Sequence, residues 1–94
     1  MYTRKATIAA SVGLHARPAA VFVRAVNSTG LAITLAKAGM KPVDGRSLLE
    51  VMSADFVHGS EVEIAVAGAA DDAAVRQAVD ELAELLRTEL KDGS

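Results

Sequence analysis

The sequence contains no cysteine and no tryptophan, and its only aromatic residues are one Tyr and two Phe. Without cysteine the chain can form no disulfide, no thiolate zinc site and no thiol nucleophile, which is typical of proteins from a reducing compartment. So few aromatic side chains cannot build a platform on which nucleic-acid bases stack. These absences exclude disulfide scaffolds, cysteine enzymes and base-stacking domains.

An excess of basic residues is also missing, since ten Lys and Arg stand against twelve Asp and Glu, for a net charge of -2. Binding to phosphate backbones requires such an excess, so we expect no nucleic-acid partner. The N-terminal MYTRKAT lacks the apolar core of a signal peptide, and no apolar run approaches the roughly 20 residues that span a bilayer. We therefore expect a soluble, cytoplasmic protein without membrane insertion.

At 94 residues, the chain has the length of one domain with one modest core. It contains no low-complexity linker and no repeat, so we predict a single domain over residues 1–94. A chain of this size has no room for a cleft between two lobes. We expect its chemistry to take place at the surface.

Alternating apolar residues predict four strands. In the first, Ala6, Ile8 and Ala10 lie on one face. Ala38-Gly39 offers a tight hairpin turn, and Pro42 suits an edge strand because it cannot donate a backbone hydrogen bond. The predicted strands cover residues 3–10, 30–37, 40–43 and 61–67.

Two helices are predicted in the second half of the chain. Ser47 and Glu50 have the Ser-x-x-Glu spacing of a capping box, which predicts a short helix from Ser47. A longer helix follows Asp71, a good N-cap, and is closed by Lys91 and Gly93. Its apolar residues recur at spacings of three and four: Val75, Val79, Leu82, Leu86 and Leu90.

The segment after His15 fits either a strand or a helix, because Val21, Phe22 and Val23 favour strands by propensity. Pro18 favours a helix, since proline is tolerated in a first turn but damages a central strand. We predict a helix over residues 16–27, which buries one face made of Ala19, Phe22, Val23 and Val26.

The resulting order is β-α-β-β-α-β-α, which predicts an α/β fold. We expect a two-layer open-faced sandwich, in which three helices cover one face of a four-stranded antiparallel sheet.

His15 therefore precedes the first turn of a helix, where free backbone N–H groups and the helix dipole favour an anion. Arg17 adds a full charge and a planar fork of donors. A neutral imidazole is nucleophilic near pH 7, and a phosphoryl group on it would bring about two negative charges, which these groups offset. The residues predict a phosphoryl seat at His15, with Arg17 and the backbone N–H groups of Ala16 and Arg17 as phosphate partners.

The residues Gly13 to Ala20, GLHARPAA, resemble the active-site signature of HPr, the histidine-containing phosphocarrier family of the phosphoenolpyruvate-dependent sugar phosphotransferase system. The length and element order are similar to that family over nearly the whole chain. The resemblance implies that His15 accepts a phosphoryl group at Nδ1 from phosphorylated Enzyme I and donates it to an Enzyme IIA domain. It implies a monomeric carrier without cofactor, which converts no small molecule itself.

The resemblance also implies a regulatory serine, Ser47, phosphorylated by an HPr kinase/phosphorylase, and an exposed apolar patch that docks partners. The sequence departs from the family at Glu50, whose carboxylate would repel a phosphoserine, although Arg46 would partly compensate. A purely structural N-cap at Ser47 is therefore an equal alternative. The patch residues are Leu48, Leu49 and Met52, with Phe22 as a further candidate.

The other polar candidates have structural explanations. His58 lies in a predicted loop, and the spacing of histidines and carboxylates suggests no metal site. Asp71 and Asp72 are explained by helix capping rather than acid and base chemistry.

Two alternatives stay open at the sequence level. One is a carrier for a regulatory branch, either nitrogen-related or of a dihydroxyacetone kinase system. The other is a regulatory protein-binding module of the same fold, with Leu49 and Met52 on its surface and Ser47 as its switch.

Overall fold

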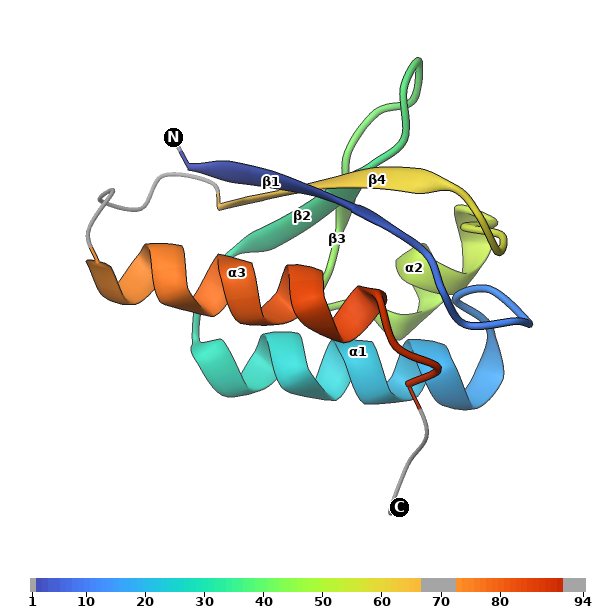
Figure 1. The fold of residues 1–94 in the computed structure, drawn as a ribbon, viewed down its shortest axis with the longest axis horizontal. Coiled ribbons are helices and arrows are strands. Elements are labelled where there is room, and N and C mark those ends of the chain that lie inside the picture. Colours follow the sequence, from blue (N-terminus) through green and yellow to red (C-terminus); the bar gives the residue numbers. More distant parts are fainter. Residues whose placement is uncertain (1, 67–72, 91–94) are drawn as a thin grey trace.

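The computed structural model describes residues 2–66 and 73–90. Within them the elements follow the predicted β-α-β-β-α-β-α order (Figure 1). Their bounds are β1 Thr3–Thr7, α1 Ala16–Thr29, β2 Ile33–Ala36, β3 Val43–Asp44, α2 Leu48–Ser53, β4 Glu61–Val66 and α3 Ala73–Leu86.

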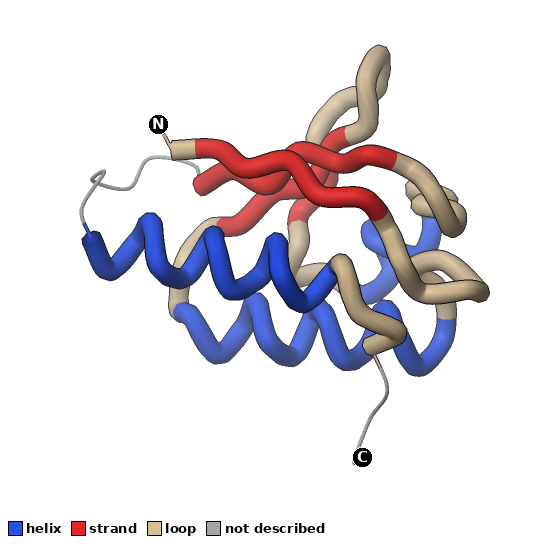
Figure 2. Tube along the Cα trace, viewed as in Figure 1, coloured by secondary structure: helices blue, strands red, loops and turns tan. Residues whose placement is uncertain are grey.

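The four strands form one antiparallel sheet in the order β1-β4-β2-β3. Ala6 of β1 pairs with Val62 of β4, and Leu35 of β2 pairs with Ile64 of β4 on the other side. Figure 2 shows the strands as one layer and the helices as a second layer below it. The predicted open-faced sandwich is confirmed.

The core lies between the sheet and the helices, and every buried side chain among the described residues is hydrophobic. The predicted inward faces are confirmed, since Ala6, Ile8 and Ala10 are buried although β1 itself ends at Thr7. In β4, Val62, Ile64 and Val66 are buried while Glu61 and Glu63 are exposed. Period-two alternation thus decides which face of each strand packs on the helices.

Helix α1 confirms the prediction that Pro18 stands in a first turn. Its buried residues are the predicted four, Ala19, Phe22, Val23 and Val26. The helix ends at Thr29, two residues beyond the predicted end, because Gly30 adopts a left-handed φ of 70° and closes it there. Gly30 was expected to begin the next strand, so this expectation was wrong.

The predicted hairpin between β2 and β3 is present, with its turn at Ala38-Gly39, but the predicted strand over residues 40–43 was wrong. Val43 pairs with Leu35 and Asp44 with Thr34, so the connection runs from residue 37 to 42 and β3 contains only two residues. Lys37 and Met40 close a turn inside this connection, with the Met40 N–H donating to the Lys37 carbonyl. Pro42 directly precedes β3 and has no N–H to donate to the ladder.

Helix α3 ends at Leu86, four residues before its predicted apolar stripe ends. Leu90 is nevertheless buried, and it has a left-handed φ of 57°. Asp71, Asp72, Lys91 and Gly93, and residue 67 of the predicted fourth strand, lie outside the described residues.

Over the described ranges, the longest helices have 14 residues, and none combines the length and the apolar character that a bilayer span needs.

Candidate functional site

His15 is the N-cap residue of α1 and has an extended backbone, with φ at -128° and ψ at 155°. Its side chain is 39% exposed, so one part of the imidazole is open to solvent while the rest is covered. Ala16, the next residue, has a φ of 50°, in the left-handed region that side chains disfavour. The chain therefore turns sharply at the histidine before the helix proceeds.

The start of α1 is electrostatically suited to an anion. No side chain caps its first N–H groups, and its first turn contains no acidic residue. Arg17 is exposed, and among the residues described here its guanidinium has no hydrogen-bond or ion-pair partner. The unsatisfied N–H groups and a free cation both lie at this helix end, next to His15.

Asp55 is the residue at this site that the sequence did not reveal. Its Oδ1 lies 3.2 Å from Nε2 of His15, although the two residues are 40 positions apart. Asp55 follows Ala54, the C-cap of α2, and has a left-handed φ of 56°. Aspartate is one of the few residues that tolerate this conformation, and that was the only signal that could have pointed to it.

Lys37 contributes a second unexpected contact from the β2–β3 connection. Its Nζ donates to the backbone carbonyl of Asp55 at 3.0 Å and lies 5.7 Å from the centroid of the Phe56 ring. Phe56 is completely buried. The segment that presents Asp55 is therefore anchored at the next residue by the core and at its own carbonyl by Lys37.

Gly13 lets the loop before α1 lie directly on the segment after α2. A Cβ built on Gly13 would come within 2.6 Å of the Phe56 carbonyl oxygen, and the φ of Gly13 is 73°. The N–H of Leu14 donates to that same carbonyl at 2.8 Å, and Leu14 is completely buried. Only glycine fits here, both for its space and for its backbone conformation.

The end of α3 and the segment after it hold the loop before His15 from the other side. The N–H of Ala9 donates to the Leu86 carbonyl at 3.0 Å. The N–H and the hydroxyl of Ser11 both donate to a Glu89 carboxylate oxygen, at 3.1 and 3.3 Å. The loop that carries His15 is thus fixed between α2 and the segment after α3, all at one end of the molecule (Figure 1).

Ser47 is confirmed as the N-cap of α2, where its hydroxyl accepts from the Glu50 N–H at 3.2 Å. The reciprocal half of the predicted capping box is wrong, because the Glu50 carboxylate accepts from the Asp44 N–H rather than from Ser47. Arg46 is held by Asp44 through Nε at 3.0 Å and Nη2 at 3.2 Å. Ser47 is therefore flanked by two carboxylates, and the nearby cation already has a partner.

The predicted apolar patch is exposed in part. Leu48 and Leu49 are exposed, Leu49 by 76%, and Met52 is half-buried. Phe22 is completely buried in α1, so its candidacy for the patch was wrong. The α helical period turns Phe22 toward the sheet together with Val26.

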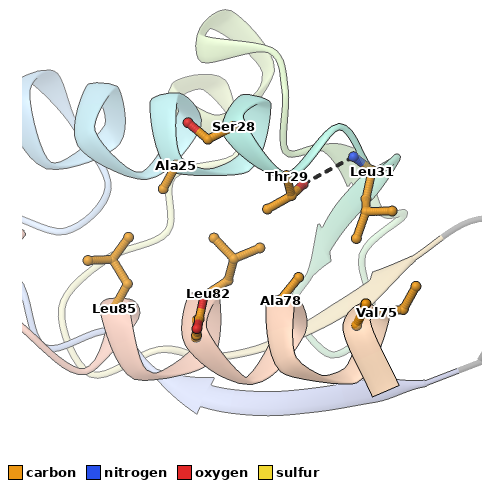
Figure 3. Close-up of a pocket in the computed structure, with 10 residues that line it drawn as sticks. Ala25, Ser28, Thr29, Leu31, Val75, Ala78, Leu82 and Leu85 are labelled. Carbon is orange, nitrogen blue, oxygen red and sulfur yellow. Dashed lines mark hydrogen bonds between the residues drawn. The ribbon is translucent and has the colours of Figure 1, made fainter. Parts of the chain in front are cut away.

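A groove outside this site lies between α1 and α3 and has a volume of about 690 Å³. Figure 3 shows its apolar lining, with Ala25 on one helix facing Leu82 and Leu85 on the other. Ala25 lies ten residues after His15, which is about 15 Å along the axis of α1. The groove therefore takes no part in the arrangement around His15.

His58 is exposed in the loop before β4, as predicted. In the part of the chain that the structure describes, no three His, Asp or Glu side chains gather in a way that could hold a metal ion.

Comparison with known proteins agrees with the fold. The family model of the PTS-HPr family, described as the PTS HPr component phosphorylation site, matches residues 2–88. The chain is 36% identical to the phosphocarrier protein HPr of Streptomyces coelicolor, over 98% of this chain and 95% of that one. It is 33% identical to the HPr of Pseudomonas putida, over 99% of each chain.

Solved structures give the same result. The crystal structure of a phosphocarrier protein HPr from Bacillus anthracis superposes with a TM-score of 0.77 at 30% identity, covering 89% of this chain and 94% of that one. The matched fold and the names of these relatives define a class of small phosphocarrier proteins. Within it, this chain belongs to the HPr family of the phosphotransferase system.

The close approach at Gly13 predicts a specific stability difference. Gly13→Ala should lower the free energy of unfolding by about 1 kcal/mol for its left-handed backbone and by a further 1–3 kcal/mol or so for the clash with Phe56. Gly30→Ala is the matched control, because Gly30 has a φ of 70° but open space around its Cβ position. Urea denaturation measures both, and equal losses in the two variants would contradict the packing argument.

The Asp44–Arg46 pair predicts a pH dependence. Hydrogen bonds from the Arg46 side chain and backbone lower the pKa of Asp44 below its ordinary value. The pair therefore stabilises the fold above about pH 4, and this contribution is lost as the pH falls through the lowered pKa. Arg46→Gln should raise the pKa of Asp44, measured by NMR titration of its carboxyl carbon. It should also lower stability at neutral pH more than at acid pH; an equal loss at both would exclude the linkage.

Proposed function

We propose that the chain is a phosphocarrier that accepts a phosphoryl group on His15 from phosphorylated Enzyme I. It then passes the group to Enzyme IIA domains during sugar uptake by the phosphotransferase system. The observation that carries the proposal is a partly exposed histidine at the uncapped start of α1, in a chain matched by the HPr family over residues 2–88. The protein works in the cytoplasm as a monomer, needs no cofactor, and turns over only with its partner enzymes.

The transfer needs a nucleophile and a place for the charge of the phosphoryl group. The lone pair of His15 Nδ1 forms a bond to phosphorus, while the bond between phosphorus and the donor breaks and its electron pair leaves with the donor. The phosphoryl oxygens come to lie at the start of α1, where the N–H groups of Ala16 and Arg17 and the free guanidinium of Arg17 offset their charge. The reverse sequence at Nδ1 delivers the group to the acceptor.

We propose that partners dock on the exposed surface of α2, through Leu48, Leu49 and the accessible part of Met52. Asp55, which touches the imidazole, comes two residues after α2 ends, so a protein bound to this surface stands next to His15. Flexible leucine and methionine side chains suit a surface that receives several partners in turn.

Phosphorylation of Ser47 by an HPr kinase/phosphorylase stays a prediction, and its surroundings favour the capping role instead. A phosphate on Ser47 would meet the carboxylates of Asp44 and Glu50, and Arg46 would have to give up Asp44 to pair with it.

The His15 assignment predicts one acid-labile phosphoryl group on the protein after incubation with phosphoenolpyruvate and Enzyme I, detected by intact-protein mass spectrometry. His15→Ala should abolish the added mass. His58→Ala is the matched control, since His58 is the chain's other histidine and is exposed, and it should be phosphorylated like the wild type. Added mass that persists in the His15 variant would refute the assignment.

The docking surface predicts a change in affinity rather than in chemistry. Leu49→Ser should raise the KM for the carrier in the Enzyme I reaction by about fivefold or more while leaving kcat nearly unchanged. Leu49 is 76% exposed, so the substitution should leave the free energy of unfolding within about 0.5 kcal/mol of the wild type. Leu49→Met keeps the apolar surface, so its KM should stay near the wild-type value. An unchanged KM in Leu49→Ser would remove this surface from the interface.

A further inference from the structure

The imidazole of His15 meets a carboxylate on the edge that carries Nε2. The distance from Nε2 to Oδ1 of Asp55 is 3.2 Å, which is within hydrogen-bonding range. The Asp55 carboxylate is 72% exposed and the imidazole 39% exposed, so the contact lies at the surface without being buried. Nothing in the docking or phosphate-binding roles proposed above uses this carboxylate.

The backbone brings the two residues together before any side-chain contact forms. Leu14, which precedes His15, donates its N–H to the carbonyl of Phe56, which follows Asp55. A backbone hydrogen bond between Leu14 and Phe56 therefore joins the residues directly next to His15 and Asp55. Lys37 holds the Asp55 carbonyl at 3.0 Å and fixes this segment from a third direction.

Backbone conformation gives a second sign of constraint at this place. Three non-glycine residues among those described have a positive φ, and two of them are Ala16 and Asp55. Such conformations cost free energy and persist where the surrounding structure enforces them, which is common at functional sites. Ala16 directly follows His15, and Asp55 is itself the other residue with a positive φ, so backbone strain lies on both sides of the contact.

The chemistry of the contact fixes the state of the ring. An ionised carboxylate can only accept hydrogen bonds, so Nε2 must carry the proton that it donates. In a neutral imidazole the other nitrogen, Nδ1, then carries the lone pair. The contact therefore selects the one tautomer in which Nδ1 is the nucleophile. It also holds the ring so that the Nδ1 edge faces away from Asp55.

We propose that Asp55 is a positioning residue for phosphoryl transfer, which orients His15 and holds the proton on Nε2 throughout the reaction. This inference rests on the function proposed above. When Nδ1 bonds to phosphorus, the donor leaves with its electron pair, the Nε2 proton stays, and the ring becomes positively charged beside the carboxylate. When the phosphoryl group moves on, the electron pair of the N–P bond returns to Nδ1 and a neutral imidazole is released.

Two substitutions separate this role from a structural one. Asp55→Gly removes the carboxylate and suits the left-handed φ of 56°, so the fold should be at least as stable as the wild type. Asp55→Asn keeps an oxygen acceptor and tolerates the same backbone, but removes the charge. We expect the rate of phosphorylation by Enzyme I to fall about two- to fivefold in the Gly variant, the range of an exposed ion pair, and less in the Asn variant.

The ring itself gives a readout that a purely structural role would not change. Long-range proton–nitrogen NMR spectra at alkaline pH report which ring nitrogen carries the proton. We expect the Nε2–H form of His15 to dominate in the wild type and the share of the Nδ1–H form to rise in Asp55→Gly. His58 provides the internal reference in the same spectra.

The order of the transfer rates among the wild type and the two variants decides whether Asp55 has the positioning role. Transfer rates that fall from wild type to Asn to Gly, while stability does not, support the positioning role. Equal rates in all three proteins, or slower transfer with an unchanged ring spectrum, overturn it and leave the phosphocarrier function standing. If the wild type itself accepts no phosphoryl group, the phosphocarrier proposal fails first, and the role of Asp55 falls with it.

Discussion

One backbone contact, between Gly13 and the carbonyl of Phe56, determines how the candidate site is assembled. The loop from β1 and the segment after α2 can meet only because Gly13 has no side chain and adopts a left-handed conformation. The hydrogen bond from Leu14 to the same carbonyl then locks the two segments together. His15 and Asp55 come into contact as a consequence, since each directly adjoins a residue of this junction.

The starts of α1 and α2 differ in electrostatics. The start of α1 has no acidic residue in its first turn and carries Arg17, which has no partner among the described residues, so positive potential remains available there. The start of α2 has Ser47 as its cap, Glu50 in its first turn, and an arginine that Asp44 already neutralises. The same helix geometry therefore favours an incoming anion at His15 and disfavours one at Ser47.

The sequence predicted features that depend on local periodicity and on single restrictive residues. Alternation placed the inward faces of the strands, and Pro18 decided correctly between a helix and a strand after His15. Element ends were less predictable, because α1 ends at a left-handed Gly30 and Leu90 beyond α3 is left-handed as well. The helical period placed Phe22 correctly on the buried face, so only its candidacy for the exposed patch was wrong.

The contact between His15 and Asp55 was beyond the reach of sequence reasoning for a different reason. The residues are 40 positions apart and belong to no common motif. Their proximity arises from the order of the strands and from the close packing of Gly13 on the Phe56 carbonyl, which the motif does not show. The residues of the motif could be found from the sequence, but Asp55, which we propose orients His15, could be found only from the fold.

The partial covering of His15 has a kinetic meaning. Asp55 lies against the Nε2 edge of a partly exposed ring, which leaves the Nδ1 edge as the approach to it. Under the proposed function, donor and acceptor must use that same approach and cannot be bound together at the histidine. The carrier then alternates between partners in a ping-pong cycle, and its throughput is bounded by how quickly each complex dissociates. A very tight interface would slow the relay, so a small and partly exposed apolar patch suits a protein that must leave each partner as readily as it binds.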